Sequence, residues 1–415
     1  MPEKKWTQKE VAQLVKLTNE NKQLSEIAAV LDRPYDSVRY KQRQLKAGPL
    51  HAEVKEEDDP RRVAFWKRQH GLLEAEVRKL RDIHDLDNLL IERIVDVAPK
   101  SYPTPKLTPL KHIKGKGAPQ SALLVFSDTH VGKVVDPEQT LGVGRYNFDV
   151  FMRRLFRLEC AVTSILHDHV TTTVPKLHIA MIGDMLDGGL THSAEVAQLN
   201  TKFNQFYAAG HAIAQFFTRL SALAPVEIHT AVGNHTRWGE QRKMPTKNRY
   251  SNLDMFLYAY VEALTLANDR IKWNLDKQPF AVFDIEGHTF YGGHGDHLKG
   301  GDRILGIPNH AIGRQVSATT QTFSMVDRAT PHYYLFGHYH KPIELPHAKG
   351  DIIVNGGFPG VDEFATSANF VGSQPSQKFA LVHPKFGLTA NYKIQLAHGD
   401  ITPHQYALPD KFKCV

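Results

Sequence analysis

The chain has 415 residues, more than one hydrophobic core usually serves, so we expect two or three folding units. Hydrophobic residues make up 41% and charged residues 23%, an ordinary globular composition that excludes a wholly disordered, collagenous or coiled-coil protein. No apolar run is long enough to span a bilayer, and the N-terminal residues lack the apolar segment of a signal peptide, so we expect a soluble, cytoplasmic protein. Cys160 and Cys414 are the only cysteines, which leaves His, Asp and Asn to hold any metal.

The formal net charge of +7 is distributed unevenly along the chain. Residues 1–120 carry 24 Lys and Arg against 18 Asp and Glu, whereas residues 121–415 carry 27 against 26. A basic excess in one segment suggests contact with a polyanion such as nucleic acid. Solvated surface lysines would explain the charge equally well.

Residues 1–48 show the periodicity of three short helices. Thr7-Gln8-Lys9-Glu10 is a capping box that predicts the start of the first helix. The second helix is expected to begin at Ser25 and to stop before Pro34, because proline disfavours helical geometry in the preceding residue. The third, over residues 38–45, would be capped by Asp36 or Ser37. It concentrates basic side chains: Arg39, Lys41, Arg43 and Lys46.

Short helices joined by a tight turn, with a basic last helix, are typical of helix-turn-helix modules that place that helix in the DNA major groove. A three-helix bundle that binds protein has the same periodicity. The segment from Trp6 to Leu45 resembles Myb/SANT-like DNA-binding domains in three places: Trp6-Thr7, Ser25-Glu26-Ile27-Ala28 and Asp36-Ser37-Val38-Arg39. We therefore expect residues 1–48 to bind DNA.

Residues 49–120 read as a connector. Residues 51–60 are acidic and end in proline, which indicates a linker. Residues 61–97 have a helical apolar pattern that could pair two chains as a homodimer or dock onto the body. Residues 100–120 contain five Lys, four Pro and no acid, which favours an extended tether able to touch phosphates.

From residue 121 onward, apolar runs typical of strands alternate with helical stretches, which predicts an α/β fold. The expected strands lie at 123–126, 179–182 and 226–232, and the expected helices at 148–166 and 194–220. Later strand-like runs have less helix between them and suggest a second sheet packed on the first. These runs are 288–291, 333–336, 351–354 and 379–382.

Metal-ligand residues follow five of these apolar runs directly. The carboxyl ends of strands are where α/β folds place ligands, so the side chains are expected to meet at one rim. The motif Asp82-Ile83-His84 has a similar form but sits in a charged helical stretch, where a solvated face is the better reading. The five blocks are Asp128-Thr129-His130, Gly183-Asp184 with Asp187, Gly233-Asn234-His235, Gly292-Gly293-His294, and Gly337-His338-Tyr339-His340.

In their order and spacing these blocks are similar to the calcineurin-like metallophosphoesterase superfamily, over about residues 121–395. The resemblance implies a four-layer α/β/β/α sandwich in residues 121–415 and two divalent metal ions bridged by Asp184. One ion would be held by Asp128, His130, Asp184 and His340. The other would be held by Asp184, Asn234, His294 and His338.

The resemblance also implies a mechanism. A hydroxide shared by the two ions would attack phosphorus in line, and His235 would protonate the leaving group. Asp187 would support the site without binding a metal ion itself. Ligands of this hardness favour Mn²⁺, with Fe, Zn or Ni as alternatives. His297 is a weaker candidate than His294 for the fourth block. Thr236 stands where the superfamily usually has an acid, which leaves the orientation of His235 open.

We therefore expect a two-metal phosphodiesterase that cleaves DNA, with basic contacts added by Arg237, Arg242 and Lys243 after the third block. The same residues fit a solvated loop comparably well. Two alternatives remain open. One is a phosphomonoesterase or small-molecule phosphodiesterase localised by its DNA-binding module, and the other is a non-catalytic DNA-binding or assembly protein.

Overall fold

The structure is a computed structural model, in which the chain divides into two compact units, Met1–Ile91 and Glu92–Val415. It describes residues 6–20, 22–46, 102, 117–187, 199–237, 252–275, 278–300, 307–363, 366, 372–397 and 403–409. The helical segment expected at 61–97 lies outside these ranges, as do Arg242 and Lys243. Among the described helices, none combines the length and apolar character needed to cross a membrane.

The described part of the first unit contains three helices. The capping box at the start of α1 is confirmed, since the Thr7 backbone N–H donates to Glu10 Oε2 at 2.8 Å and the Glu10 N–H donates to Thr7 Oγ1 at 3.3 Å. A small apolar cluster joins the helices and comprises Leu14, Ile27, Ala28, Leu31 and Val38. The helices are α1 (Gln8–Asn19), α2 (Leu24–Val30) and α3 (Tyr35–Lys46).

Two of the predicted helix starts in this unit are wrong. The helix α2 begins at Leu24 with Gln23 as its N-cap, one residue before the expected Ser25. The helix α3 begins immediately after Pro34, whose carbonyl accepts a hydrogen bond from the Val38 N–H at 3.2 Å. Asp36 therefore lies in the first turn of α3 and does not cap it. A proline at the entry of a helix has no N–H to satisfy, which lets the helix begin earlier.

The second unit contains two β-sheets and flanking helices, so the predicted mixed α/β class is confirmed. The six-stranded sheet has the order β11-β10-β1-β2-β3-β4, in which β1 to β4 run parallel. Its strands are β1 (Ser121–Phe126), β2 (Leu177–Ile182), β3 (Val226–Ala231), β4 (Ile271–Asn274), β10 (Ser376–His383) and β11 (Gly387–Gln395).

The five-stranded sheet has the order β5-β6-β7-β9-β8. The expected strand at 379–382 does not belong to it, because β10 pairs antiparallel with β1, with Leu124 opposite Phe379. A short apolar run carries no signal for its partner, so the sequence could not assign it. The strands of this sheet are β5 (Ala281–Ile285), β6 (His288–Gly293), β7 (Tyr333–Phe336), β8 (Ile343–His347) and β9 (Gly350–Val354).

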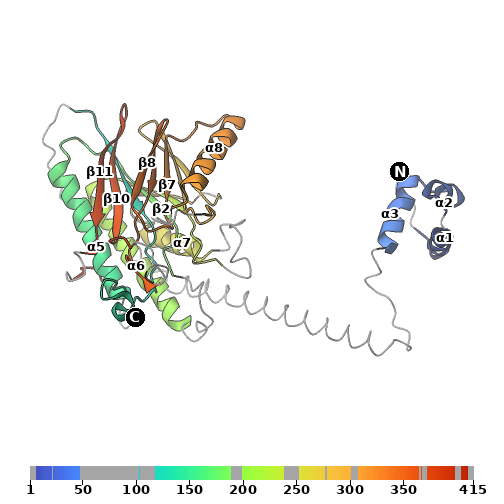
Figure 1. The fold of residues 1–415 in the computed structure, drawn as a ribbon, viewed down its shortest axis with the longest axis horizontal. Coiled ribbons are helices and arrows are strands. Elements are labelled where there is room, and N and C mark those ends of the chain that lie inside the picture. The colour runs from blue at the N-terminus through green and yellow to red at the C-terminus, as the bar shows by residue number, and fades with distance from the viewer. Residues whose placement is uncertain are drawn as a thin grey trace. The chain divides into compact units, whose positions relative to one another are not determined.

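Alternate side chains of β1 pack on opposite faces of the six-stranded sheet. Leu124 and Phe126 join an apolar cluster with α5, α6 and α7, whereas Leu123 and Val125 join one with the five-stranded sheet. The other face of that sheet packs on α8, and Figure 1 shows α5 and α8 on opposite sides of this unit. The helical elements are η1 (Pro137–Thr140), α5 (Phe148–Ser164), η2 (Ile165–His169), α6 (Leu199–Leu223), α7 (Leu253–Thr265) and α8 (Asn309–Met325).

Candidate metal centre

The five sequence blocks lie in the loops that follow β1, β2, β3, β6 and β7. Backbone hydrogen bonds hold the first two loops together, from the Asp128 N–H to the Gly183 carbonyl and from the His130 N–H to the Asp184 carbonyl, both at 3.0 Å. The loop after β7 joins them, because the His338 N–H donates to Asp128 Oδ1 at 2.9 Å. The two sheets therefore bring their ligand-bearing loops to one place.

The backbone is strained where the candidate ligands lie. Nine described residues other than glycine have a positive φ, and five of them belong to the sequence blocks. Residues other than glycine rarely adopt this backbone conformation, which persists only where the surrounding structure holds it. The five residues are Asp128 (54°), His130 (43°), Asp184 (53°), His338 (70°) and His340 (54°).

Two glycines let the loops after β2 and β3 approach each other. Gly183 has a φ of 94°, and a Cβ placed on it would lie 2.5 Å from the Gly233 nitrogen. A Cβ on Gly233 would collide with the backbone and carboxylate of Asp184. The contact between the loops therefore requires both glycines.

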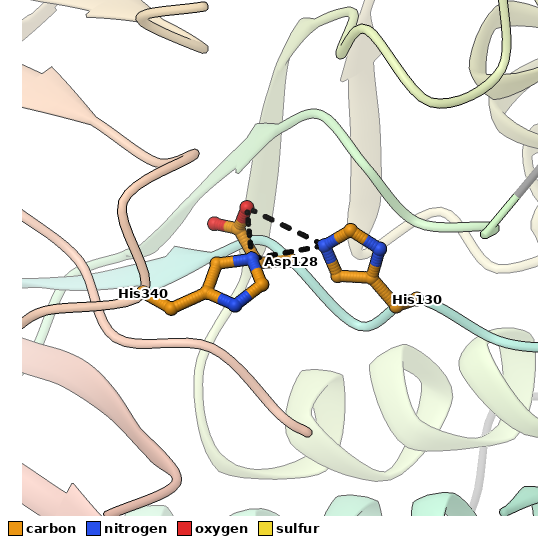
Figure 2. Close-up of side chains that lie close together, drawn as sticks. All are labelled: Asp128, His130 and His340. Atoms are coloured by element: carbon orange, nitrogen blue, oxygen red, sulfur yellow. Dashed lines mark hydrogen bonds and ion pairs between the residues drawn. The ribbon is translucent and has the colours of Figure 1, made fainter. Parts of the chain in front are cut away.

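One group of candidate ligands consists of Asp128, His130 and His340 (Figure 2). Asp128 Oδ1 lies 3.3 Å from His340 Nε2 and 3.9 Å from His130 Nε2, and the two Nε2 atoms are 2.9 Å apart. Asp128 and His130 are buried. A carboxylate oxygen and two imidazole nitrogens thus face a common point, as ligands of a divalent ion do.

A second group surrounds Asp184 and includes His294 and His338. His294 Nε2 lies 2.8 Å from Asp184 Oδ2 and 3.0 Å from Asn234 Oδ1. The other ring nitrogen, Nδ1, is 3.0 Å from the Ile182 carbonyl, to which it donates a hydrogen bond. Metal-binding histidines characteristically donate their second N–H in this way, which leaves Nε2 directed at the ion.

The surroundings of Asp184 Oδ2 show whether the site fits a cation. This atom is buried and makes no hydrogen bond of acceptable geometry, although His294 Nε2 is 2.8 Å away and the Nε2 atoms of His130 and His235 are each 3.9 Å away. A buried carboxylate oxygen without a hydrogen bond is costly unless a charge compensates it. The carboxylate, imidazole and amide donors around it suit a divalent transition-metal ion.

The pKa values in this cluster separate the histidines into two kinds. Burial lowers the pKa of His130 and of His338 to about 4, so both are neutral and their nitrogens are free to act as ligands. Burial would also lower the pKa of His294, but the Asp184 carboxylate raises it to about 10. The pKa of Asp184 is correspondingly held well below its usual range. The proton on His294 is the charge that a bound cation would replace.

His235 and Asp187 lie beside the first group. His235 Nδ1 is 3.4 Å from Asp187 Oδ1 and 3.3 Å from the Asp187 carbonyl. Burial would lower the pKa of His235, but Asp184 and Asp187 together raise it to about 9. The Thr236 hydroxyl donates to Asn252 Oδ1 at 2.5 Å. Asp187 therefore orients His235, which answers the question left by Thr236.

Asp254 was not among the predicted site residues, and the structure places it beneath the cluster. Its buried carboxylate accepts the N–H groups of Asp184 at 2.9 Å, Met185 at 3.1 Å and Gly233 at 2.9 Å. Burial, reinforced by the Asp184 charge, raises the pKa of Asp254 to about 6. Asp254 lies in the first turn of α7, after an Asn252 N-cap, and the usual reading of that pattern is helix capping alone.

The remaining predicted site residues lie elsewhere. His297 is outside the cluster, where its Nε2 lies 3.2 Å from Gln315 Oε1. Arg237 forms an ion pair with Asp296. Arg39 is exposed on α3 and Lys41 is half-buried, while Arg43 and Lys46 complete that helix with side chains outside the described part. The structure thus brings together the seven proposed metal ligands, His235 and Asp187: Asp128, His130, Asp184, Asn234, His294, His338 and His340.

No protein-family model and no curated protein matches the chain. Matching solved structures include an archaeal phosphodiesterase with 10% identity and a TM-score of 0.30, covering 66% of this chain and 99% of that one. A dimetal phosphatase from Danio rerio has 11% identity and a TM-score of 0.34, with 68% and 100% covered. Vps29 from Entamoeba histolytica has 12% identity and a TM-score of 0.27, with 66% and 98% covered. Phosphoesterases are thus among the structure neighbours, but at these TM-scores the likeness carries no argument about activity.

Proposed function

We propose that this chain is a two-metal-dependent phosphodiesterase that hydrolyses DNA. The observation that carries the proposal is the convergence of six residues with nitrogen or oxygen donors near Asp184, whose buried Oδ2 makes no hydrogen bond of acceptable geometry. Asp184 would bridge two divalent ions. One ion would take Asp128, His130 and His340 as its further ligands, and the other Asn234, His294 and His338. We propose Mn²⁺ because the donors are carboxylate, amide and imidazole without thiolate.

Two bound ions would lower the pKa of water and neutralise the charge on the phosphate oxygens. The protein supplies the proton. Imidazole titrates near neutral pH, and Asp187 holds the Nδ1 side of His235. His235 Nε2 would then donate a proton to the leaving oxygen of the phosphodiester. Backbone N–H groups donate hydrogen bonds to the carboxylates of Asp128 and Asp184, which would keep these two ligands in a fixed orientation.

DNA as the substrate is proposed from the first unit. Its third helix, α3, carries Arg39, Lys41, Arg43 and Lys46 and follows α2 after a short turn, an arrangement suited to the major groove. A module that holds the chain on DNA raises the concentration of phosphodiester bonds near the catalytic unit, so tight binding at the site itself is unnecessary.

The test is a nuclease assay with Mn²⁺ on single-stranded, duplex and end-modified DNA, run beside p-nitrophenyl mono- and diesters. We expect DNA cleavage that EDTA abolishes and that His235→Ala reduces by about 100-fold, the range for a general acid. His310→Ala, at an exposed position on α8, is the matched control. Efficient release of p-nitrophenol from the monoester without DNA cleavage would contradict the proposal and favour a phosphomonoesterase.

A further inference from the structure

The two oxygens of the Asp128 carboxylate have different surroundings. Oδ1 accepts the His338 N–H at 2.9 Å and lies 3.3 Å from His340 Nε2 and 3.9 Å from His130 Nε2, so it faces the first group of candidate ligands. Oδ2 lies 2.5 Å from Ser127 Oγ. Ser127 and Asp128 are both fully buried. One oxygen is thus directed at the candidate metal centre and the other at a neighbouring hydroxyl.

The proton between Ser127 Oγ and Asp128 Oδ2 belongs to the serine. Two oxygens 2.5 Å apart need a proton between them, and a carboxylate that binds a cation is ionised and can only accept. Asp128 is a candidate metal ligand, so the Ser127 hydroxyl is the donor. Hydrogen bonds from a hydroxyl to an ionised carboxylate are shorter and stronger than those between neutral groups, so this contact orients the carboxylate firmly.

Asn355 and Gln377 hold Ser127 in this orientation. The Lys378 N–H donates to Asn355 Oδ1 at 3.0 Å, so the Asn355 atom that lies 2.9 Å from Ser127 Oγ is Nδ2. An amide nitrogen only donates, so it cannot take the serine proton, which is left for Asp128 Oδ2. Gln377 Oε1 accepts the Ser127 N–H at 3.0 Å, and Gln377 Nε2 donates to the Ser127 carbonyl at 3.2 Å. Asn355 and Gln377 are each 1% exposed.

Gly337 encloses the same carboxylate oxygen from another loop. A Cβ placed on Gly337 would lie 2.6 Å from Asp128 Oδ2 and 3.2 Å from Ser127 Oγ. The loop after β7 therefore packs directly against Oδ2. Because protein encloses Oδ2 while Oδ1 faces two imidazole nitrogens, Oδ1 is the oxygen available to a metal ion.

We propose that Ser127 is a positioning residue, which keeps Asp128 Oδ2 in a hydrogen bond so that Asp128 binds the first ion through Oδ1 alone. This inference rests on the proposed metal centre. Ser127→Ala would remove one of the two hydrogen bonds that orient the carboxylate, the other being from the His338 N–H. Loss of such a partner of a metal ligand typically weakens metal binding by about 10-fold to 100-fold.

The test is calorimetric titration with Mn²⁺ of the full chain, freed of metal with EDTA. We expect two binding events in the unmodified chain, and His340→Ala identifies the event that belongs to the ion beside Asp128. Ser127→Ala should weaken that event by about 10-fold to 100-fold and the other event much less. Ser221→Ala is the matched control, because Ser221 is an equally buried serine whose hydroxyl donates to the Thr218 carbonyl on α6.

Unchanged Mn²⁺ affinity in Ser127→Ala would overturn this proposal and leave the metal centre intact, whatever the melting temperature in EDTA. Equal weakening of both events would also overturn it, since that result indicates a general structural role. No Mn²⁺ binding by the unmodified chain would overturn the proposed function as well.

A crystal structure of the unmodified chain with Mn²⁺ keeps the proposal testable if Ser127→Ala fails to fold. We expect Asp128 to bind one ion through Oδ1 alone, with Oδ2 hydrogen-bonded to Ser127 Oγ. A bond from Asp128 Oδ2 to either ion would contradict the proposal.

Discussion

Buried histidines lie at both ends of the parallel strands of the six-stranded sheet, in different electrostatic settings. The amino edge is the side where β2 and β3 begin, and the carboxyl edge is the side where the candidate metal ligands follow the strands. At the amino edge, burial lowers the pKa of His178 and His229, and the Glu227 carboxylate is shared with two lysines. At the carboxyl edge, burial also lowers the pKa of His130 and of His338 to about 4. Asp184 outweighs burial at the other two histidines and raises the pKa of His294 to about 10 and of His235 to about 9.

The difference teaches what separates a structural histidine pair from a candidate reactive site. Burial alone yields neutral rings that hydrogen-bond to each other, as at the amino edge. A reactive cluster needs carboxylates that are themselves buried and held in place by backbone, as Asp128 and Asp184 are. Backbone strain differs in the same way, since five of the nine described residues other than glycine with a positive φ belong to the ligand blocks at the carboxyl edge.

The largest effect is expected from Asp184→Asn, which removes the charge shared by both proposed ions. We expect metal-dependent phosphodiesterase activity to fall by more than about 100-fold, beyond what outer partners of metal ligands contribute. Elemental analysis should show loss of bound transition metal. Asp269→Asn, at an exposed position, is the control. Full activity with unchanged metal content would remove Asp184 from the centre of the site.

Asp254→Asn tests whether the carboxylate beneath the cluster positions it. An amide offers one acceptor in place of two, so its NH₂ group would face a backbone N–H of Asp184, Met185 or Gly233. We expect Mn²⁺ affinity, measured by calorimetry, to weaken by about 10-fold to 100-fold. Glu262→Gln on the same helix is the control. If the melting temperature fell while Mn²⁺ affinity stayed unchanged, Asp254 would have only a structural role.

The lowered pKa values of His178 and His229 at the amino edge predict that the stability of the fold depends on pH. Both histidines bind a proton near pH 6.5 when unfolded but only near pH 4 and pH 3 when folded, since burial lowers each pKa. Between these values the unfolded state binds more protons, so stability is full above pH 6.5 and is lost as the pH falls.

Removal of one ring should reduce this dependence. Between about pH 7.5 and about pH 5, His178→Gln should lose about 2 kcal/mol less stability than the unmodified chain. The measurement is urea unfolding followed by near-UV circular dichroism, with His310→Gln as control. An unaltered pH profile would show that His178 is already protonated in the fold at pH 5.

The smallest effect is expected from Lys272→Met. The Lys272 side chain is 69% exposed, and Glu227 keeps its closer contact with Lys176. An exposed ion pair of this kind contributes less than about 1 kcal/mol, and high salt weakens it further. Urea unfolding should therefore barely change. A loss of several times that value would mean that Lys272 is essential to the stability of the amino edge.

The sequence predicted the carboxyl edge better than the amino edge for a physical reason. Each ligand block follows an apolar run directly, so the end of a strand and the chemistry that follows it are visible together in one segment. His178 and His229 lie within strands and alternate with apolar residues as any half-buried polar residue does. Their contact depends on the pairing of β2 with β3, in which His178 lies opposite Glu227, and no local pattern encodes that register.

Asp254 and the pairing of β10 with β1 were missed for a related reason. Asp254 is distant in sequence from Asp184, and its partners are backbone N–H groups, which have no sequence signature. The expected strand at 379–382 was recognisable as a strand, but its place beside β1 depends on packing across the whole chain. In the first unit, the capping box identified α1 correctly, while the start of α3 depended on how Pro34 is accommodated.

Anomalous diffraction from crystals of the full chain grown with Mn²⁺ would test the central claim most directly. We predict two peaks that flank Asp184, about 3.5 to 4 Å apart, as in two-metal hydrolytic sites. One peak should lie beside His130 and His340 and the other beside His294 and His338. The absence of any peak within bonding distance of Asp184 would contradict the metal centre and, with it, the proposed hydrolysis.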